Sequence, residues 1–189
     1  MTQSDGVGHT RSIHAPHRLT YEESCRFLQS KHLFREGDIP PLLDRPPRYD
    51  DEVLGVDLFR WNIQDSKLEN LTLPRTYIGR SEFSQCSFAG TDLNESVANW
   101  NDFLDVSFVG TNLTSFDMRA CNHQRSDFTR AILRNADLRL CNFEDCRFDD
   151  ADMAGAKLTR EAAATLLFSE AQRNVIDWQA DDGPEPDGG

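Results

Sequence analysis

A bulky apolar residue recurs at every fifth position of the chain from Leu58 to Leu158. Of the 21 positions in this series, only Ala98 and His123 are not Leu, Ile, Met or Phe. A period of five fits neither the 3.6-residue period of an α-helix nor the two-residue period of a β-strand. The chain must therefore turn a corner every five residues and bury one large side chain between successive corners.

A second inward position lies two residues before each apolar one and is mostly Ala, Ser, Thr or Cys. The residue between the two is Asp or Asn in 11 of the 21 repeats. Four sides of five residues close a square coil, so residues twenty apart should lie above one another at the spacing of β-strands. The pattern predicts a solenoid.

Residues 136–140 and 151–155 read Ala-Asp-Leu-Arg-Leu and Ala-Asp-Met-Ala-Gly. They resemble the Ala-(Asp/Asn)-Leu-X-X consensus of the pentapeptide-repeat family, and the resemblance covers residues 56–160. It implies an all-β solenoid, a right-handed quadrilateral β-helix of about five coils. At roughly 4.8 Å per coil, such a rod would be about 25 Å long.

The segment before the repeats has its own organisation. Thr20 is a suitable N-cap, and a helix is expected from there to Lys31, with Cys25 buried. Two Pro-Pro pairs then indicate an extended connector, so residues 19–55 form an N-terminal helix and a Pro-rich connector. We expect residues 1–18 to be a flexible arm.

The segment after the repeats is expected to cap the solenoid, whose ends would otherwise expose core and unpaired backbone. Within residues 161–180, the Ala- and Leu-rich stretch 162–173 predicts a capping helix. Val175, Ile176 and Trp178 should fold back on the last coil. The acidic, Gly- and Pro-containing tail 181–189 is expected to be disordered.

Composition excludes several classes of protein. The formal net charge of -12 disfavours direct binding to nucleic acid or to anionic lipid. No apolar run is long enough to span a membrane, and the first residues do not resemble a secretory signal. Five cysteines, an odd number, argue against a disulfide framework and favour a reducing, cytoplasmic location.

No enzyme motif is present: the sequence has no GxSxG, HExxH or Walker pattern, and no cysteine pair has metal-binding spacing. We therefore expect neither an enzyme nor a cofactor. His123 is interpreted as a satisfied core histidine or a local bulge rather than a functional group. Ala98 leaves a volume deficit that Trp100 could cover by folding over the edge.

Residues twenty apart share a side of the coil, so the formal charge of each side can be summed separately. The side centred on Ile63, Phe83 and Phe103 nets -5, and the side centred on Leu58 and Ile78 nets +3. The acids of the first side are Asp65, Glu82, Asp102, Asp105, Glu144 and Asp145, against Arg125. The cations of the second are Arg60, Arg80, Arg119, Arg139, Lys157 and Arg160, against three acids.

These charges suggest a non-enzymatic scaffold that binds and neutralises or shields another bacterial protein, in the manner of an immunity protein or antitoxin. The six acids, with Trp100 and Leu104, are the candidate partner-binding residues. The resemblance implies an alternative, since some family members mimic DNA, bind DNA gyrase or topoisomerase IV and protect against quinolones. A homodimer through Leu166, Leu167 and Trp178 at the C-terminal cap is also possible on sequence grounds. An enzyme or metal protein built on the N-terminal arm is the least favoured reading.

Overall fold

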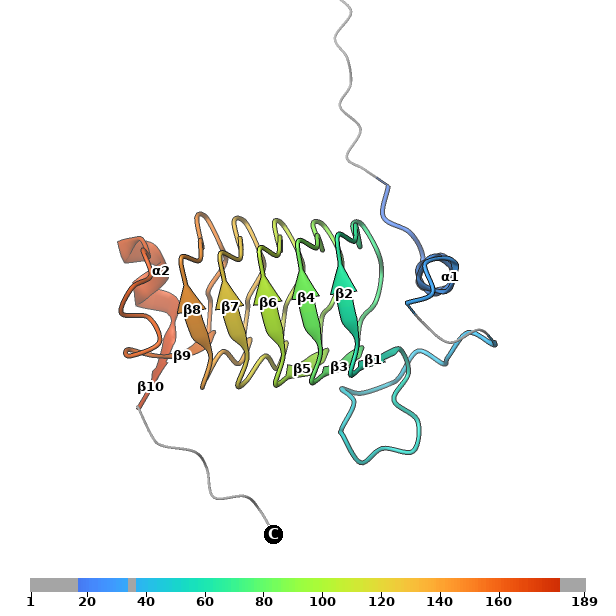
Figure 1. The fold of residues 1–189 in the computed structure, drawn as a ribbon. Helices are drawn as coiled ribbons and strands as arrows, with labels where there is room; N and C mark the ends of the chain where they lie inside the picture. The colour runs from blue at the N-terminus through green and yellow to red at the C-terminus, as the bar shows by residue number, and fades with distance from the viewer. Residues whose placement is uncertain (1–16, 34–36, 181–189) are drawn as a thin grey trace, which may run out of the picture.

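The computed structural model describes residues 17–33 and 37–180 of the chain. The predicted disordered tail 181–189, and the predicted flexible arm apart from its last two residues, lie outside this range. The described residues form a β-solenoid with one helix at each end (Figure 1). The elements are α1 (Tyr21–Ser30), β1 (Asp57–Phe59), β2 (Asn62–Gln64), β3 (Tyr77–Gly79), β4 (Glu82–Ser84), β5 (Val97–Asn99), β6 (Asp102–Leu104), β7 (Asn122–Gln124), β8 (Asn142–Glu144), β9 (Lys157–Thr159), α2 (Glu170–Val175) and β10 (Asp177–Gln179).

Every strand pair is parallel and offset by exactly one 20-residue coil, as the repeat predicts. We call the side formed by β1, β3, β5, β9 and β10 the A face, and the five-stranded sheet β2-β4-β6-β7-β8 the B face. Outside these strands, isolated parallel β-bridges between residues twenty apart connect each coil, or rung, to the next. The register runs from Asp57 to Asp177, about six turns, one more than the five expected from residues 56–160.

The core contains two columns of stacked rings, beside columns of mainly aliphatic side chains such as Leu73, Leu93 and Leu113. Phe83, Phe103, His123 and Phe143 stack with ring centroids 4.7–5.2 Å apart. The neighbouring column of Phe88, Phe108, Phe128 and Phe148 stacks at 4.7–5.4 Å. Rings of one column meet those of the other edge to face, the arrangement that aromatic quadrupoles favour. The apolar residue of each repeat therefore supplies the interior, as expected.

The corners of the coil impose a backbone conformation that the residue types do not reveal. The second residue after each apolar one has a positive φ, between 48° and 69°, in nearly every repeat. At Gly90 and Gly110 this conformation carries no steric penalty. At Trp100, Ala120 and Leu140 it costs about 1–2 kcal/mol each, which the surrounding rungs must offset.

His123 is a core residue, but its polar atoms are not satisfied. The side chain is 1% exposed, and the register of β6, β7 and β8 shows no bulge there. Neither ring nitrogen has a hydrogen-bond partner among the described residues. The expectation of a satisfied histidine is therefore wrong, because the Phe rings above and below it offer no acceptor. Burial lowers the pKa of His123 to about 3.

All five cysteines are free thiols, and four of them point inward from the small position of a repeat. The Cys121 and Cys141 thiols donate to the carbonyl oxygens of Ala98 and Met118, both at 2.9 Å. Burial raises the pKa of the Cys121 thiol to about 12. These cysteines pack and bond to the backbone, and they stay protonated at neutral pH.

The N-terminal helix closes the first coil. Thr20 is its N-cap and forms a capping box with Glu23, and the helix buries Cys25, as predicted. The Thr72 N–H of the first coil donates to the Ser24 hydroxyl at 2.8 Å. Backbone N–H and C=O groups of the first coil, which would be unpaired at a bare solenoid end, thus form hydrogen bonds with α1 and the residues before it.

At the other end a capping helix is present, as predicted, but the bounds 162–173 are wrong. Residues 160–165 form turns, and the helix α2 begins only at Glu170, with Ser169 as its N-cap. A helix over 162–173 would carry the chain away from the rod. The turn instead lets β10 return and pair with β9, which places Trp178 beside Leu158. Gln172 completes the cap by donating to the Phe148 and Ala151 carbonyls.

We expect His123→Phe to stabilise the protein by about 1–3 kcal/mol, because it removes two unpaired buried nitrogens and continues the column of rings. The unfolded chain binds a proton near pH 6.5 and the folded chain only near pH 3. The wild type should therefore lose about 1.4 kcal/mol of stability for each pH unit below 6.5, and the variant should lack this component. Urea unfolding between pH 7 and pH 4 measures both effects. Equal pH slopes in the two proteins would contradict the prediction, and His32→Gln on the surface is the control.

Candidate protein-binding surface

The B face brings together the acids that the charge sum selected. Glu82, Asp102 and Glu144 point outward from β4, β6 and β8, and Leu104 lies among them on β6. The other three acids, Asp65, Asp105 and Asp145, follow directly after β2, β6 and β8 at one edge of the sheet. The predicted partner-binding acids thus share one sheet and its border.

Hydrogen bonds along the rungs fix several of these carboxylates. Asn62 donates to Glu82 at 3.0 Å and Asn122 donates to Asp102 at 2.7 Å, each from the neighbouring coil. Gln124 likewise donates to Glu144 at 2.8 Å. Each of these amides is neutral, so the carboxylates are oriented without losing their charge.

One acid of the group is neutralised within the chain. The Arg125 guanidinium makes two hydrogen bonds to Asp105, at 2.6 and 2.8 Å, and these hold the pKa of the Asp105 carboxyl below its usual range. Both side chains are exposed, so this pair adds little to stability. Its effect is to remove one charge from the acidic edge.

The A face is less basic than the formal charges suggest. Arg119 binds Asp117 through two hydrogen bonds of 2.9 Å, and Arg139 binds Asp137 in the same way. In both pairs the Asp is the central residue of a repeat and the Arg follows two positions later. The hydrogen bonds that the Arg119 guanidinium donates to Asp117 raise the pKa of Arg119. Two of the cations counted for this side are therefore paired locally.

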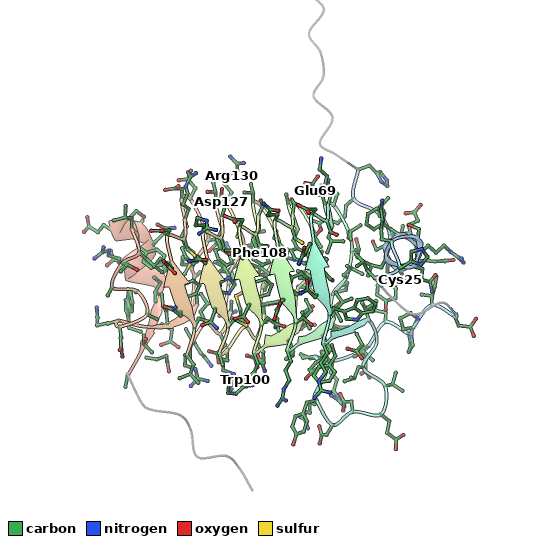
Figure 2. All side chains as sticks on the ribbon, viewed as in Figure 1. Cys25, Glu69, Trp100, Phe108, Asp127 and Arg130 are labelled. Carbon is green, nitrogen blue, oxygen red and sulfur yellow. The ribbon has the colours of Figure 1, made fainter. Side chains whose placement is uncertain are left out.

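The prediction that Trp100 covers Ala98 is wrong. Ala98 is fully buried, whereas Trp100 is 68% exposed and points away from the rod (Figure 2). It stands at the corner where the A face and the B face meet. The tryptophan therefore does not repair a packing defect, and its ring is available to a binding partner.

A groove of about 650 Å³ lies between the connector and the A face, with Trp100 at its edge. A bidentate ion pair between Arg45 and Asp51 holds the connector loop, whose tip, Tyr49, is 83% exposed. Other residues that line the groove are Phe59, Tyr77, Arg80, Arg48 and Asn99. The loop that forms one wall of this groove has no repeat pattern, so its two Pro-Pro pairs are the signal of the groove in the sequence.

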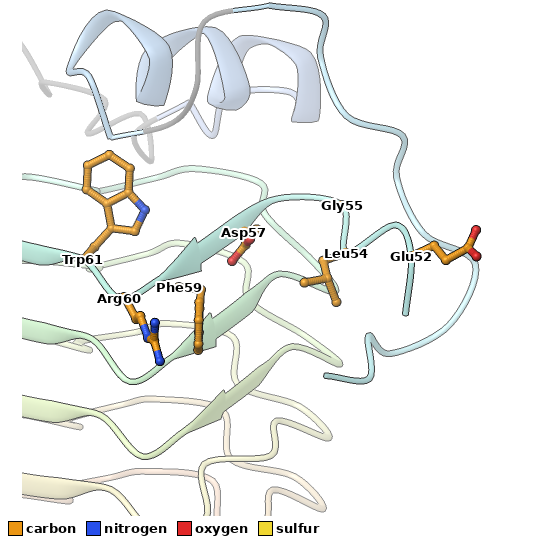
Figure 3. A pocket seen from close by; sticks show the side chains of 7 residues that line it. All are labelled: Glu52, Leu54, Gly55, Asp57, Phe59, Arg60 and Trp61. Atoms are coloured by element: carbon orange, nitrogen blue, oxygen red, sulfur yellow. The ribbon is translucent and has the colours of Figure 1, made fainter. Parts of the chain in front are cut away.

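A second hollow, of about 530 Å³, opens at the N-terminal end of the rod (Figure 3). Phe59 and Arg60 stand side by side on its wall, with the Arg60 guanidinium 5.0 Å from the centre of the Phe59 ring. This hollow holds no arrangement of nucleophile, base and orienting group. It extends the aromatic and cationic character of the A face to the first coil.

The predicted dimer contacts have different surroundings. Leu166 is only 4% exposed and packs inside its own chain, so it is a cap contact. Leu167 is 87% exposed. Trp178 is partly buried, lies under the Arg160 guanidinium at 4.8 Å and donates to the Arg173 carbonyl. Leu167 alone remains a fully exposed candidate for a contact between two copies.

Within residues 17–33 and 37–180, no three His, Cys, Asp or Glu side chains converge as a metal site would require. Over the same residues, no helix is long and apolar enough to cross a membrane.

Residues 76–158 match the family model described as a pentapeptide repeat region. No curated protein matches the chain. Among solved structures, it is similar to HetL, a pentapeptide repeat protein involved in heterocyst differentiation regulation in the cyanobacterium Nostoc sp., with 18% identity and a TM-score of 0.39 over 54% of this chain and 51% of HetL.

Two further similarities are to QnrB1 and to a plant protein. QnrB1, a plasmid-mediated fluoroquinolone resistance protein, is 19% identical with a TM-score of 0.47, over 56% of this chain and 57% of that one. A pentapeptide repeat protein of the Arabidopsis thaliana thylakoid lumen is 22% identical with a TM-score of 0.33, over 60% of this chain and 72% of that one. The matched region spans little more than half the length of HetL and QnrB1.

The five-residue register from Leu58 to Leu158, the square coil that it forms and the match to the family model all agree. Residues 76–158 are thus a pentapeptide repeat region, and the same five-residue register continues on both sides of them.

Proposed function

We propose that this protein is a non-enzymatic scaffold that binds another bacterial protein through the B face and its two borders, and so neutralises or shields it. The observation that carries the proposal is the set of carboxylates held in place on one flat sheet, with Leu104 among them and Trp100 at the border. A protein surface that presents Lys and Arg side chains is the complementary partner. An immunity-like or antitoxin-like role is one form of this activity.

The dimensions of the face indicate how far the interface must extend. Five rungs at about 4.8 Å and three residues at about 3.3 Å give a sheet surface of about 240 Å². A stable interface buries about 800 Å² on each partner. The partner must therefore reach around both borders, to Trp100 on one side and to Asp65 and Asp145 on the other.

The test is a charge reversal on the B face, Asp102→Lys with Glu144→Lys, in the full chain. We expect the variant to bind the partner about tenfold more weakly or worse, because each reversed charge faces a cation of the partner. The partner is first captured from a bacterial lysate by the immobilised wild type, identified and purified, and its affinity is then measured by titration.

Glu69→Lys with Asp150→Lys is the matched control, since it makes the same change in net charge on other sides of the rod. The control should bind as the wild type does. If the control and the B-face variant lose affinity equally, net charge alone governs binding and the B face is not the site. If neither variant loses affinity, the proposed site is wrong.

A second candidate function is binding to DNA gyrase or topoisomerase IV by mimicry of DNA. The carboxylates of β4, β6 and β8 favour it, since they form a row along one side of the rod, as phosphates do along a duplex. The row is interrupted at β7, whose outward residues are Asn122 and Gln124. Pairing of Asp105 with Arg125 weakens it, because one charge of the series is neutralised.

A gyrase supercoiling assay, with and without a fluoroquinolone, tests this second function. Mimicry predicts inhibition or protection at stoichiometric protein concentrations and loss of the effect in the Asp102→Lys, Glu144→Lys variant. No effect of the wild type at large excess would exclude gyrase mimicry and leave the dedicated protein partner as the function.

A further inference from the structure

One corner of the rod carries an unusual column of residues. Where the A face turns into the B face, five corner residues with positive φ lie one above another: Arg60, Arg80, Trp100, Ala120 and Leu140. Arg160 directly follows β9 and takes the next place in the register, although its φ is not positive. Trp100 and Leu140 are 68% and 52% exposed. The column, which we call the corner column, thus contains exposed cations and exposed apolar side chains and no carboxylate.

The chain leaves the described structure at the end of this same column. Gln179 of β10 pairs in register with Thr159 of β9, so Ala180 takes the next position of the column after Arg160. The nine residues that follow are Asp-Asp-Gly-Pro-Glu-Pro-Asp-Gly-Gly, with four acids and no cation. The tail therefore starts where a complementary surface begins.

The groove at the far end of the column suits this sequence. Three aromatic side chains, Tyr49, Phe59 and Tyr77, line it together with Trp100. Aromatic grooves bind proline-containing segments, whose extended conformation is already formed before binding.

Arg80 also lines the groove, and among the residues that the structure describes it forms no ion pair. Two carboxylates, Asp50 and Asp117, also line the groove, and Asp117 pairs with Arg119. Arg48 and Arg80 outnumber the remaining acid, so the groove can bind both a proline and an acid of the tail.

We propose that residues 181–189 lie along the corner column of their own chain and place Pro186 and Asp187 in the groove. Pro186 contacts Trp100 and the aromatic wall, and Arg80 pairs with the tail acid Asp187. This proposal does not depend on which partner binds the B face.

The length of the tail matches the distance. Trp100 lies four rungs from Ala180 along the column and Arg80 five, or about 19 and 24 Å at 4.8 Å per rung. An extended chain of about 3.1 Å per residue places Pro186 about 19 Å and Asp187 about 22 Å beyond Ala180. The tail therefore reaches Trp100 with Pro186 and Arg80 with Asp187, without slack.

Attachment to the same chain favours this occupant over others. A short tether raises the local concentration of the tail to the millimolar range, so a weak contact is sufficient. The same contact covers Trp100, which borders the B face. A partner that uses Trp100 would have to displace the tail.

The test labels the full chain with 5-fluorotryptophan, which gives one fluorine NMR signal each for Trp61, Trp100 and Trp178. Each signal is assigned with a Trp→Phe variant. The tail is then neutralised by Asp181→Asn, Asp182→Asn, Glu185→Gln and Asp187→Asn. We expect the Trp100 signal alone to shift, and its solvent isotope effect to rise towards that of free 5-fluorotryptophan.

A charge exchange makes the test specific. Arg80→Glu should reproduce the effect of the neutral tail on Trp100, and Arg80→Glu with Asp187→Arg should restore the wild-type signal. Asp150→Asn, an exposed acid at the opposite corner, is the control and should change nothing.

Three results would overturn the proposal. One is a Trp100 signal that is the same in the wild type and the neutral-tail variant. Another is failure of the charge exchange to restore the signal. The third is a Trp100 shift that depends on protein concentration, since it would show that the tail of a second copy, or a partner, occupies the groove.

Discussion

The parallel register of twenty residues is the constraint on which the rest of the structure depends. Each rung donates and accepts backbone hydrogen bonds with the rung on either side, so a position keeps the same surroundings in every coil. Ring stacks such as Phe108 on Phe128 follow from this register, as do the amide contacts to Asp102 and Glu82. A single inserted residue would move every later side chain out of its column.

The core was predictable because burial selects residue type. A solenoid interior accepts only apolar or small side chains at fixed positions, so the five-residue period of apolar residues can be recognised in the sequence. The corners were not predictable, since the fold imposes a positive φ on whatever residue stands there, including Trp100 and Leu140. The C-terminal cap left a weaker signal: Phe168 and Trp178 continue the period of five, and both pack on the last coils.

The sum of formal charges predicted where the acidic face lies, but not how many charges on either face remain unpaired. A charge sum treats each side chain as free, whereas Arg119 and Arg139 each bind an aspartate two residues earlier in the same rung. Arg125 instead pairs with Asp105 across coils. Which partner an arginine selects depends on geometry within a few ångströms, which the sequence does not specify. The aromatic groove was missed for a related reason, since an irregular loop forms its wall.

Function in such a rod is expected where a residue serves no structural need. The fold requires a positive φ at the corner position but sets no requirement on the side chain, which points into solvent. Polar residues or glycine meet that condition at most corners, whereas the corner column has Trp100 and Leu140. An exposed indole contributes nothing to the stability of the isolated coil, and burying it releases about 25 cal/mol per Å². The favourable free energy of covering Trp100 is therefore available only to whatever segment or partner covers it.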